Sequence, residues 1–175
     1  DGVRDDTATD DHLDLLNKQV RPMSHQGIID YLEEPRATML ATHREQVTFW
    51  NARMLSTLPA ETGIFTATAW GNFPKDHFPA DPFLSLKVGA KVMLLRNNMP
   101  FWVNGTVARV VEVNEYGVGV EITSGPNSGL RVLVEEEIWG HYHYELVDGE
   151  ITRLLDGTFT QIPVRLAWAA TIHKS

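Results

Sequence analysis

Residues 161–175 read QIPVRLAWAATIHKS, and this stretch decides how the fold of the chain is interpreted. Apolar side chains occupy nearly every position from 164 to 170, which fits a buried strand or a buried helix equally well. The polar end offers hydroxyl, imidazole and ammonium groups, which suit contacts to a phosphate; they belong to Thr171, His173, Lys174 and Ser175. A polar segment that simply follows a core element is the alternative interpretation.

The same fifteen residues resemble motif V of the Pif/RecD branch of superfamily-one DNA helicases, which continues with Gln-Gly in that family. The resemblance implies an α/β fold with a partial RecA-like domain, that is, a parallel sheet of the P-loop NTPase type. It also implies that the chain is a segment of a longer protein, truncated within the motif. By resemblance, Thr171 and His173 donate hydrogen bonds to a DNA backbone phosphate, supported by Lys174 and Ser175.

The composition is that of one folded domain, or of one domain with an insert, because 175 residues with 43% hydrophobic side chains can bury a substantial core. The formal net charge of -8 disfavours nucleic-acid binding, whose affinity comes mainly from Lys and Arg. Between residues 83 and 111, however, all charged side chains are basic: Lys87, Lys91, Arg96 and Arg109. This run predicts a local positive patch, or else ordinary solvated strand charges.

The sequence also bears on location. It contains no cysteine, which excludes disulfides and thiolate metal sites, and no apolar run approaches the ~20 residues of a membrane span. The first twelve residues are acidic and polar, unlike a secretory signal. Together with the resemblance, these features predict a bacterial cytoplasmic protein with no membrane partner.

Residues 37–41 (ATMLA) form a short apolar run of the kind found in buried parallel strands. Thr42 and Glu45 have the spacing of a capping box, which predicts a helix that extends to Pro59. In α/β folds, ligands bind beyond the carboxyl ends of the strands. Residues 40–51 (LATHREQVTFWN) resemble the fourth motif of the same helicases, which implies DNA or nucleotide contacts by Thr42, Arg44 and Asn51. A helix cap, a solvated arginine and a helix-packing asparagine are the alternative roles.

Residues 63–70 (GIFTATAW) predict one strand, and residues 71–82, with three prolines and two aspartates, predict a linker held down by Phe73 and Phe78. We place a domain boundary here. Residues 1–82 would form the first part of the RecA-like domain, residues 83–157 an insert, and residues 158–175 the return segment that carries motif V.

Short segments separated by Gly and Asn turns recur roughly every 8 to 12 residues from Leu84 onward, which predicts a small antiparallel barrel. The expected strands are 91–95, 106–113, 118–122, 130–134, 141–146 and 150–155, and turns include Asn104-Gly105 and Asp156-Gly157. Residues 86–97 (LKVGAKVMLLRN) and 103–106 (VNGT) resemble the SH3-like barrel inserted in these helicases, which commonly have Gln where Lys91 stands. We include Lys91, Asn104 and Gly105 among the expected DNA contacts.

His141 and His143 would point to one face of a strand, as a metal-binding pair does. No third ligand stands at a suitable spacing in the sequence, so we favour a half-exposed strand and expect no metal.

The expected function is that of a fragment of an ATP-dependent 5′-to-3′ DNA helicase, which holds single-stranded DNA and contributes to translocation. The parent protein would bind ATP and Mg²⁺, but the sequence has no GxxxxGK[ST] loop, so we expect no cofactor and no catalytic residue in this fragment. The missing first motor domain of the same protein would be its partner. The alternative is a non-catalytic nucleic-acid- or protein-binding module built on a small barrel; a free-standing hydrolase lacks a recognisable nucleophile and base.

Overall fold

The computed structural model describes residues 9–35, 37–147 and 150–172. The chain divides between Tyr31 and Leu32 into two compact units. Two short helices, α1 (Asp10–Asn17) and α2 (His25–Glu33), precede or cross this division. α2 ends just before Glu34-Pro35, because proline disfavours helical geometry in the residue before it.

The second unit contains one pair of parallel strands from opposite ends of the sequence. β1 (Met39–Ala41) pairs with β12 (Ala169–Thr171), so that Ala41 lies opposite Thr171. This confirms a parallel strand within residues 37–41 and resolves the apolar run 164–170 into strands rather than a helix. The described residues contain only this one parallel pair, so a RecA-like parallel sheet stays a prediction.

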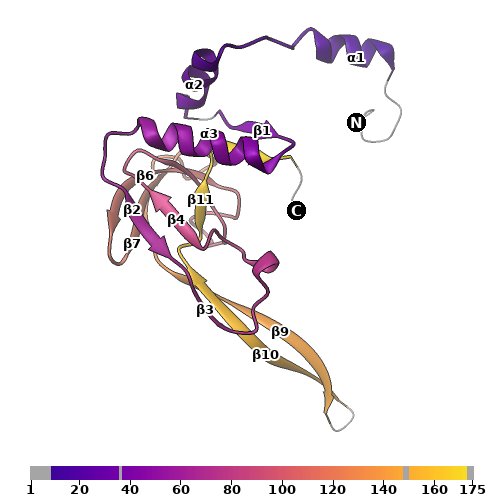
Figure 1. The fold of residues 1–175 in the computed structure, drawn as a ribbon, viewed down its shortest axis with the longest axis vertical. Helices are drawn as coiled ribbons and strands as arrows, with labels where there is room; N and C mark the ends of the chain where they lie inside the picture. Colours follow the sequence, from indigo (N-terminus) through magenta and orange to yellow (C-terminus); the bar gives the residue numbers. More distant parts are fainter. Residues whose placement is uncertain (1–8, 36, 148–149, 173–175) are drawn as a thin grey trace. The chain divides into compact units, whose positions relative to one another are not determined.

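Helix α3 (Arg44–Thr57) follows β1 and packs against β12, as the violet helix beside the yellow strand in Figure 1 shows. It buries Trp50, Asn51 and Met54, whose spacing places them on one helical face. The predicted capping box is wrong. His43 is the N-cap residue and makes no side-chain capping bond, while the Thr42 hydroxyl lies 2.8 Å from Nδ1 of His43 instead.

Five short strands form an antiparallel sheet in the order β11-β5-β6-β7-β8. They are β5 (Lys91–Leu94), β6 (Val107–Asn114), β7 (Gly117–Ile122), β8 (Arg131–Val134) and β11 (Val164–Leu166). Their buried face supplies much of the core, including Val92, Leu94, Ala108, Val110, Val120 and Ile122. The expected antiparallel strands are present, but among the described residues β11 and β8 do not pair to close a barrel.

The two last strands predicted for the barrel form a separate hairpin instead. β9 (Glu137–Val147) and β10 (Glu150–Gln161) pair along their length and extend away from the five-stranded sheet (Figure 1). The turn predicted at Asp156-Gly157 is wrong, because β10 continues through these residues with a register shift between Leu155 and Gly157. A bulge and a turn have similar local sequences, and here the partner strand decides between them.

Residues 63–70 form two strands rather than one. β2 (Gly63–Thr66) pairs with β4 (Phe83–Leu86), and β3 (Thr68–Gly71) pairs with β10. The connection after β3, which includes the single-turn helix η1 (Lys75–His77), is held by aromatic contacts. Phe78 lies 4.4 Å from Phe159, centroid to centroid, and Phe73 lies 5.8 Å from the same ring, which confirms the predicted role of both phenylalanines.

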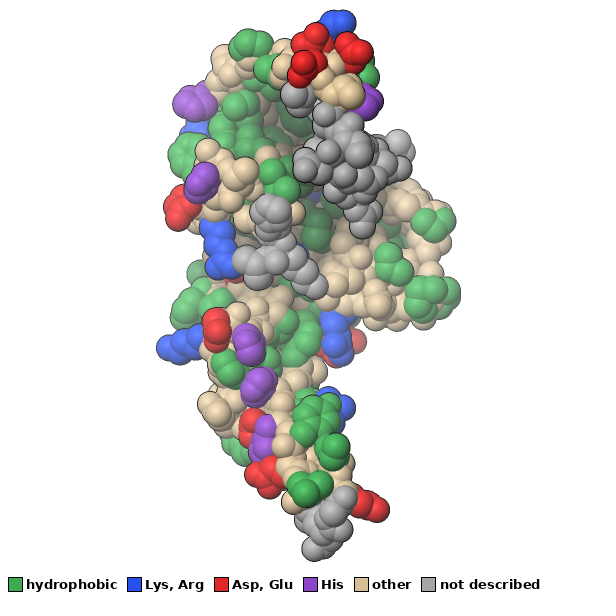
Figure 2. All heavy atoms as spheres, turned by 90° about the vertical axis from the view of Figure 1, so that its right-hand side faces the viewer, with side chains coloured by type: hydrophobic (Ala, Val, Ile, Leu, Met, Phe, Trp, Pro, Cys, Tyr) green, Lys and Arg blue, Asp and Glu red, His purple; other side chains and the backbone are tan. Residues whose placement is uncertain are grey.

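Side-chain alternation gives the β9–β10 hairpin two different faces. One face is apolar and exposed and carries Ile138, Tyr142, Tyr144, Leu146, Ile151 and Leu155. The other face carries His143, which contacts Asp156 and Glu145. Figure 2 shows hydrophobic side chains gathered on one side of this hairpin and histidines on the other.

Candidate nucleic-acid interface

The carboxyl ends of β1 and β12 lie side by side and bring two predicted site residues together. Ala41 is opposite Thr171, and the backbone N–H of Ile172 donates to the carbonyl of Ala41 at 3.0 Å. Thr42 follows β1 directly, so its hydroxyl lies at the same edge as Thr171. This is the edge at which α/β folds bind ligands.

The start of α3 adds charge and hydrogen-bond donors to this edge. Arg44 is the first residue of α3 and is exposed, as are Thr42 and His43 before it. The N-terminus of a helix also favours an anion, because its first backbone N–H groups have no partner within the helix. His43 was not among the predicted site residues, although its position as a polar residue directly before a predicted helix was a usable signal. A hydroxyl, an imidazole and a guanidinium therefore follow one another along three residues.

His173, Lys174 and Ser175 lie outside the described residues. Their contacts with a phosphate stay a prediction that rests on the resemblance to motif V. Thr171 is described and is partly buried at the end of β12.

Asn51 has a structural role at this edge. Its side chain is buried and forms two hydrogen bonds with the backbone of Ala169, which hold α3 against β12. The side chain is therefore committed to packing the helix, in agreement with the alternative stated for it above.

Lys91 is not at the surface, which corrects its assignment as a DNA contact. Its side chain is only 5% exposed, and the ammonium donates to the carbonyls of Leu32, Glu34 and Ala37 at 2.9, 2.6 and 2.8 Å. Three hydrogen bonds use all three donors of a lysine, so none is left for a phosphate. Burial, and then the neighbouring Arg109, lowers the pKa of Lys91 to about 8, and Glu34 opposes this shift.

Three of the four basic side chains of the predicted positive patch make contacts within the chain. Lys91 is buried, and Lys87 donates to the carbonyl of Leu58 at 2.8 Å. Arg96 forms an ion pair with Glu137 and lies over the ring of Trp139. Arg96 and Arg109 are both exposed. Within the part of the chain that the structure describes, Arg109 makes no such contact. The run 83–111 is therefore not a continuous cationic surface.

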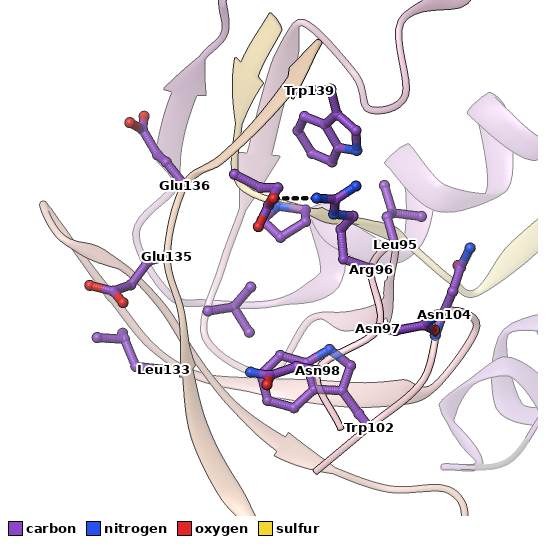
Figure 3. A pocket seen from close by; sticks show the side chains of 13 residues that line it. Leu95, Arg96, Asn97, Asn98, Trp102, Asn104, Leu133, Glu135, Glu136 and Trp139 are labelled. Carbon is purple, nitrogen blue, oxygen red and sulfur yellow. Dashed lines mark hydrogen bonds and ion pairs between the residues drawn. The ribbon is translucent and has the colours of Figure 1, made fainter. Parts of the chain in front are cut away.

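The Asn104-Gly105 turn is present as predicted. Gly105 has φ 92°, a left-handed conformation that favours glycine, and its N–H donates to the carbonyl of Leu94 at 2.8 Å. The N–H of Asn104 donates to Oδ1 of Asn97 at 2.7 Å. The turn borders a cavity of about 780 Å³ in which Arg96, Trp102 and Trp139 are drawn in Figure 3. Contact of Asn104 or Gly105 with DNA stays a prediction.

His143, one of the two histidines of β9, contacts two carboxylates. Nδ1 of His143 lies 2.6 Å from Asp156 and Nε2 lies 3.1 Å from Glu145. Across residues 9–35, 37–147 and 150–172, no three His, Cys, Asp or Glu side chains converge as metal ligands. Likewise, no helix in these ranges has the length and apolar character needed to span a membrane.

Comparisons by sequence and by structure both find Pif1 helicases. No protein-family model matches the chain. The ATP-dependent DNA helicase Pif1 of Psychrobacter sp. is 28% identical over 191 residues, which cover 79% of this chain and 28% of that protein. Two solved structures of Pif1 from Bacteroides match nearly the whole chain and 38% of their own: the unliganded protein (31% identity, TM-score 0.82, 99% of this chain) and the protein bound to ssDNA (30%, 0.72, 98%). The chain thus spans well under half of the relatives it matches.

Proposed function

Because this chain is Pif1-like in both sequence and fold, we propose that it is a segment of an ATP-dependent DNA helicase and that its part in the motor is to hold single-stranded DNA. The observation that supports this role is the shared edge of β1 and β12. There Thr171 pairs with Ala41, the residue before Thr42, and α3 begins two residues after Thr42.

The chemistry of this edge suits a phosphate rather than a base. Thr42 and Thr171 supply hydroxyl donors, and Arg44 supplies a planar guanidinium that can bind a phosphate through two N–H groups. Contacts of this kind position a strand without reading its sequence. A motor needs this property, because it must hold each successive nucleotide equally well. Movement in the 5′-to-3′ direction is part of the proposal and follows from the resemblance.

ATP and Mg²⁺ belong to the parent protein in this proposal. The sequence contains no GxxxxGK[ST] loop to bind the β- and γ-phosphates, so we assign nucleotide binding to the rest of the parent protein. The first motor domain, as the partner of this segment, would supply that loop. What this chain contributes is a rigid edge, since Asn51 fixes α3 to β12.

The test is binding of a fluorescent dT15 oligonucleotide, measured by anisotropy at two salt concentrations. We expect weak binding that falls with salt, because phosphate contacts release counterions. Arg44→Gln should weaken binding and reduce the slope of log K against log salt by about one. Arg53→Gln is the matched control: it removes the same charge from an exposed position of the same helix.

Two outcomes would reject this site. Equal loss of affinity in both arginine variants would indicate general electrostatic attraction to α3. Binding that survives Arg44→Gln but is lost in Asn104→Ala would place the DNA contact on the five-stranded sheet and favour the binding-module alternative.

A further inference from the structure

The cavity beside the Asn104-Gly105 turn has an unusual lining. The loop that follows β5 forms one wall, and the connection from β8 to β9 forms the other. Trp102 lies on the first wall and Trp139 on the second, and both rings are visible in Figure 3. The first wall is braced, because the side-chain amide of Asn127 donates to the carbonyls of Pro100 and Phe101 at 2.9 and 2.7 Å.

A guanidinium group already occupies part of this cavity. The side chain of Arg96 lies over Trp139, with 5.6 Å from Cζ to the ring centroid, and forms an ion pair with Glu137 (Figure 3). An aromatic face together with a carboxylate is an arrangement that binds arginine well, because the guanidinium both stacks and donates in its own plane. Nearly half of the Arg96 side chain is exposed (46%), so this contact can be exchanged.

The rim of the cavity carries two further carboxylates. Glu135 and Glu136 are exposed on the same wall as Glu137, and neither takes part in a hydrogen bond or ion pair with another described residue. Figure 3 shows both carboxylates pointing away from Arg96. With Arg96 neutralised by Glu137, the lining has two unpaired negative charges. Such a site repels phosphate and attracts a cation.

We propose that this cavity binds the arginine side chain of a basic protein segment, and that Arg96 is its internal, exchangeable occupant. The incoming guanidinium takes the place of Arg96 between Trp139 and Glu137. Glu135 and Glu136 attract the positive segment and raise its rate of association. This function is independent of the DNA-binding edge at Thr42, and it gives the acidic chain a second surface with the opposite charge preference.

The experiment titrates the chain with the peptide acetyl-GRGRG-amide and follows the indole N–H signals of Trp102 and Trp139 by NMR. The lysine peptide acetyl-GKGKG-amide should bind more weakly, because an ammonium neither stacks nor forms a paired contact. Glu137→Gln, and Glu135→Gln together with Glu136→Gln, should weaken binding. Glu115→Gln is the control, because it removes an exposed carboxylate at the turn between β6 and β7 and should leave affinity unchanged.

The decisive variant is Arg96→Ala. If Arg96 competes with the peptide, its removal should tighten binding about two- to fivefold, the range of an exposed cation–π contact. Arg96→Gln should act in the same direction and guards against a local change of fold. Unchanged or weaker peptide binding in both variants would overturn the proposal. Shifts of the same two indole signals by dT15 that disappear in Arg96→Ala would also overturn it, since they would make Arg96 a phosphate contact.

Discussion

Asn51 and Ala169 are joined by a reciprocal pair of hydrogen bonds between a helix side chain and a strand backbone. Nδ2 of Asn51 donates to the carbonyl of Ala169 at 3.0 Å, and the N–H of Ala169 donates to Oδ1 at 2.9 Å. Both partners are buried. Asn51 therefore substitutes for a neighbouring strand on one side of β12, whose other side pairs with β1.

Replacing Asn51 should therefore destabilise the fold. Asn51→Ala leaves a buried N–H and a buried carbonyl without partners, and we expect a loss of about 2–4 kcal/mol in the free energy of unfolding. Urea denaturation followed by tryptophan fluorescence measures this loss. Gln46→Ala, at an exposed position of the same helix, should change stability by less than about 0.5 kcal/mol. A loss of similar size in the two variants would contradict the role given to Asn51.

Lys91 should be needed for stability rather than for DNA binding. Lys91→Met keeps an unbranched side chain of similar shape, one heavy atom shorter, but leaves the carbonyls of Leu32, Glu34 and Ala37 without their donor. We expect a loss of about 2–3 kcal/mol in the free energy of unfolding and unchanged affinity for dT15 under conditions in which the variant is folded. Lys91→Gln, which keeps two N–H donors on a shorter side chain, should fall between wild type and Lys91→Met.

The control for Lys91 is Lys75→Met, which removes an exposed lysine from η1. Its stability should match wild type. If Lys91→Met lowered DNA affinity and left stability intact, the sequence-based assignment would be right and the structural role wrong.

Local pattern predicted the elements of this chain better than their partners. The apolar run 37–41 predicted a buried strand, but its pairing with β12 came only from the structure, because residues 164–170 fit a strand and a helix equally well. Lys91 shows the opposite case. A lysine on a short strand looks solvated in the sequence, and only the fold brings three backbone carbonyls to its ammonium.

The same limit applies to the hairpin. Asp156-Gly157 has the composition of a turn, but β9 is long enough to pair with residues on both sides of it, so the extra residue becomes a bulge. The length of a strand depends on its partner, which a single segment of sequence does not contain. His43 is similar, because the pairing of β1 with β12 two residues before it is not visible in the local sequence.

Phe159 should be the residue that fixes the linker 71–82 to the hairpin. Its ring is fully buried among Phe73, Phe78 and Trp139. Phe159→Ala removes these contacts and leaves a cavity, so we expect a loss of about 3–5 kcal/mol in the free energy of unfolding by urea denaturation. Phe83→Ala is the control, because Phe83 is 75% exposed. Little loss in Phe159→Ala would show that the linker is held by other contacts.

His143 should make the hairpin sensitive to pH. Hydrogen bonds that the His143 ring donates to Glu145, and then to Asp156, raise the pKa of His143 above its ordinary value of 6.5. The native state therefore binds this proton more tightly than the unfolded state does. Its stabilising contribution is complete below about pH 6.5 and is lost as the pH rises through the higher native pKa. Amide hydrogen exchange in β9 and β10, corrected for its intrinsic pH dependence, should accelerate over that interval.

Carboxylate variants test this assignment directly. An NMR titration of the His143 ring should give a pKa above 6.5 in the wild type, and Glu145→Gln should lower it more than Asp156→Asn does, because Glu145 makes the larger contribution. Glu150→Gln, which removes an exposed carboxylate of β10 that makes no contact with His143, should leave the value unchanged. A His143 pKa of 6.5 or below in the wild type would mean that the contacts to Glu145 and Asp156 do not persist in solution, and the predicted pH dependence of the hairpin would then disappear.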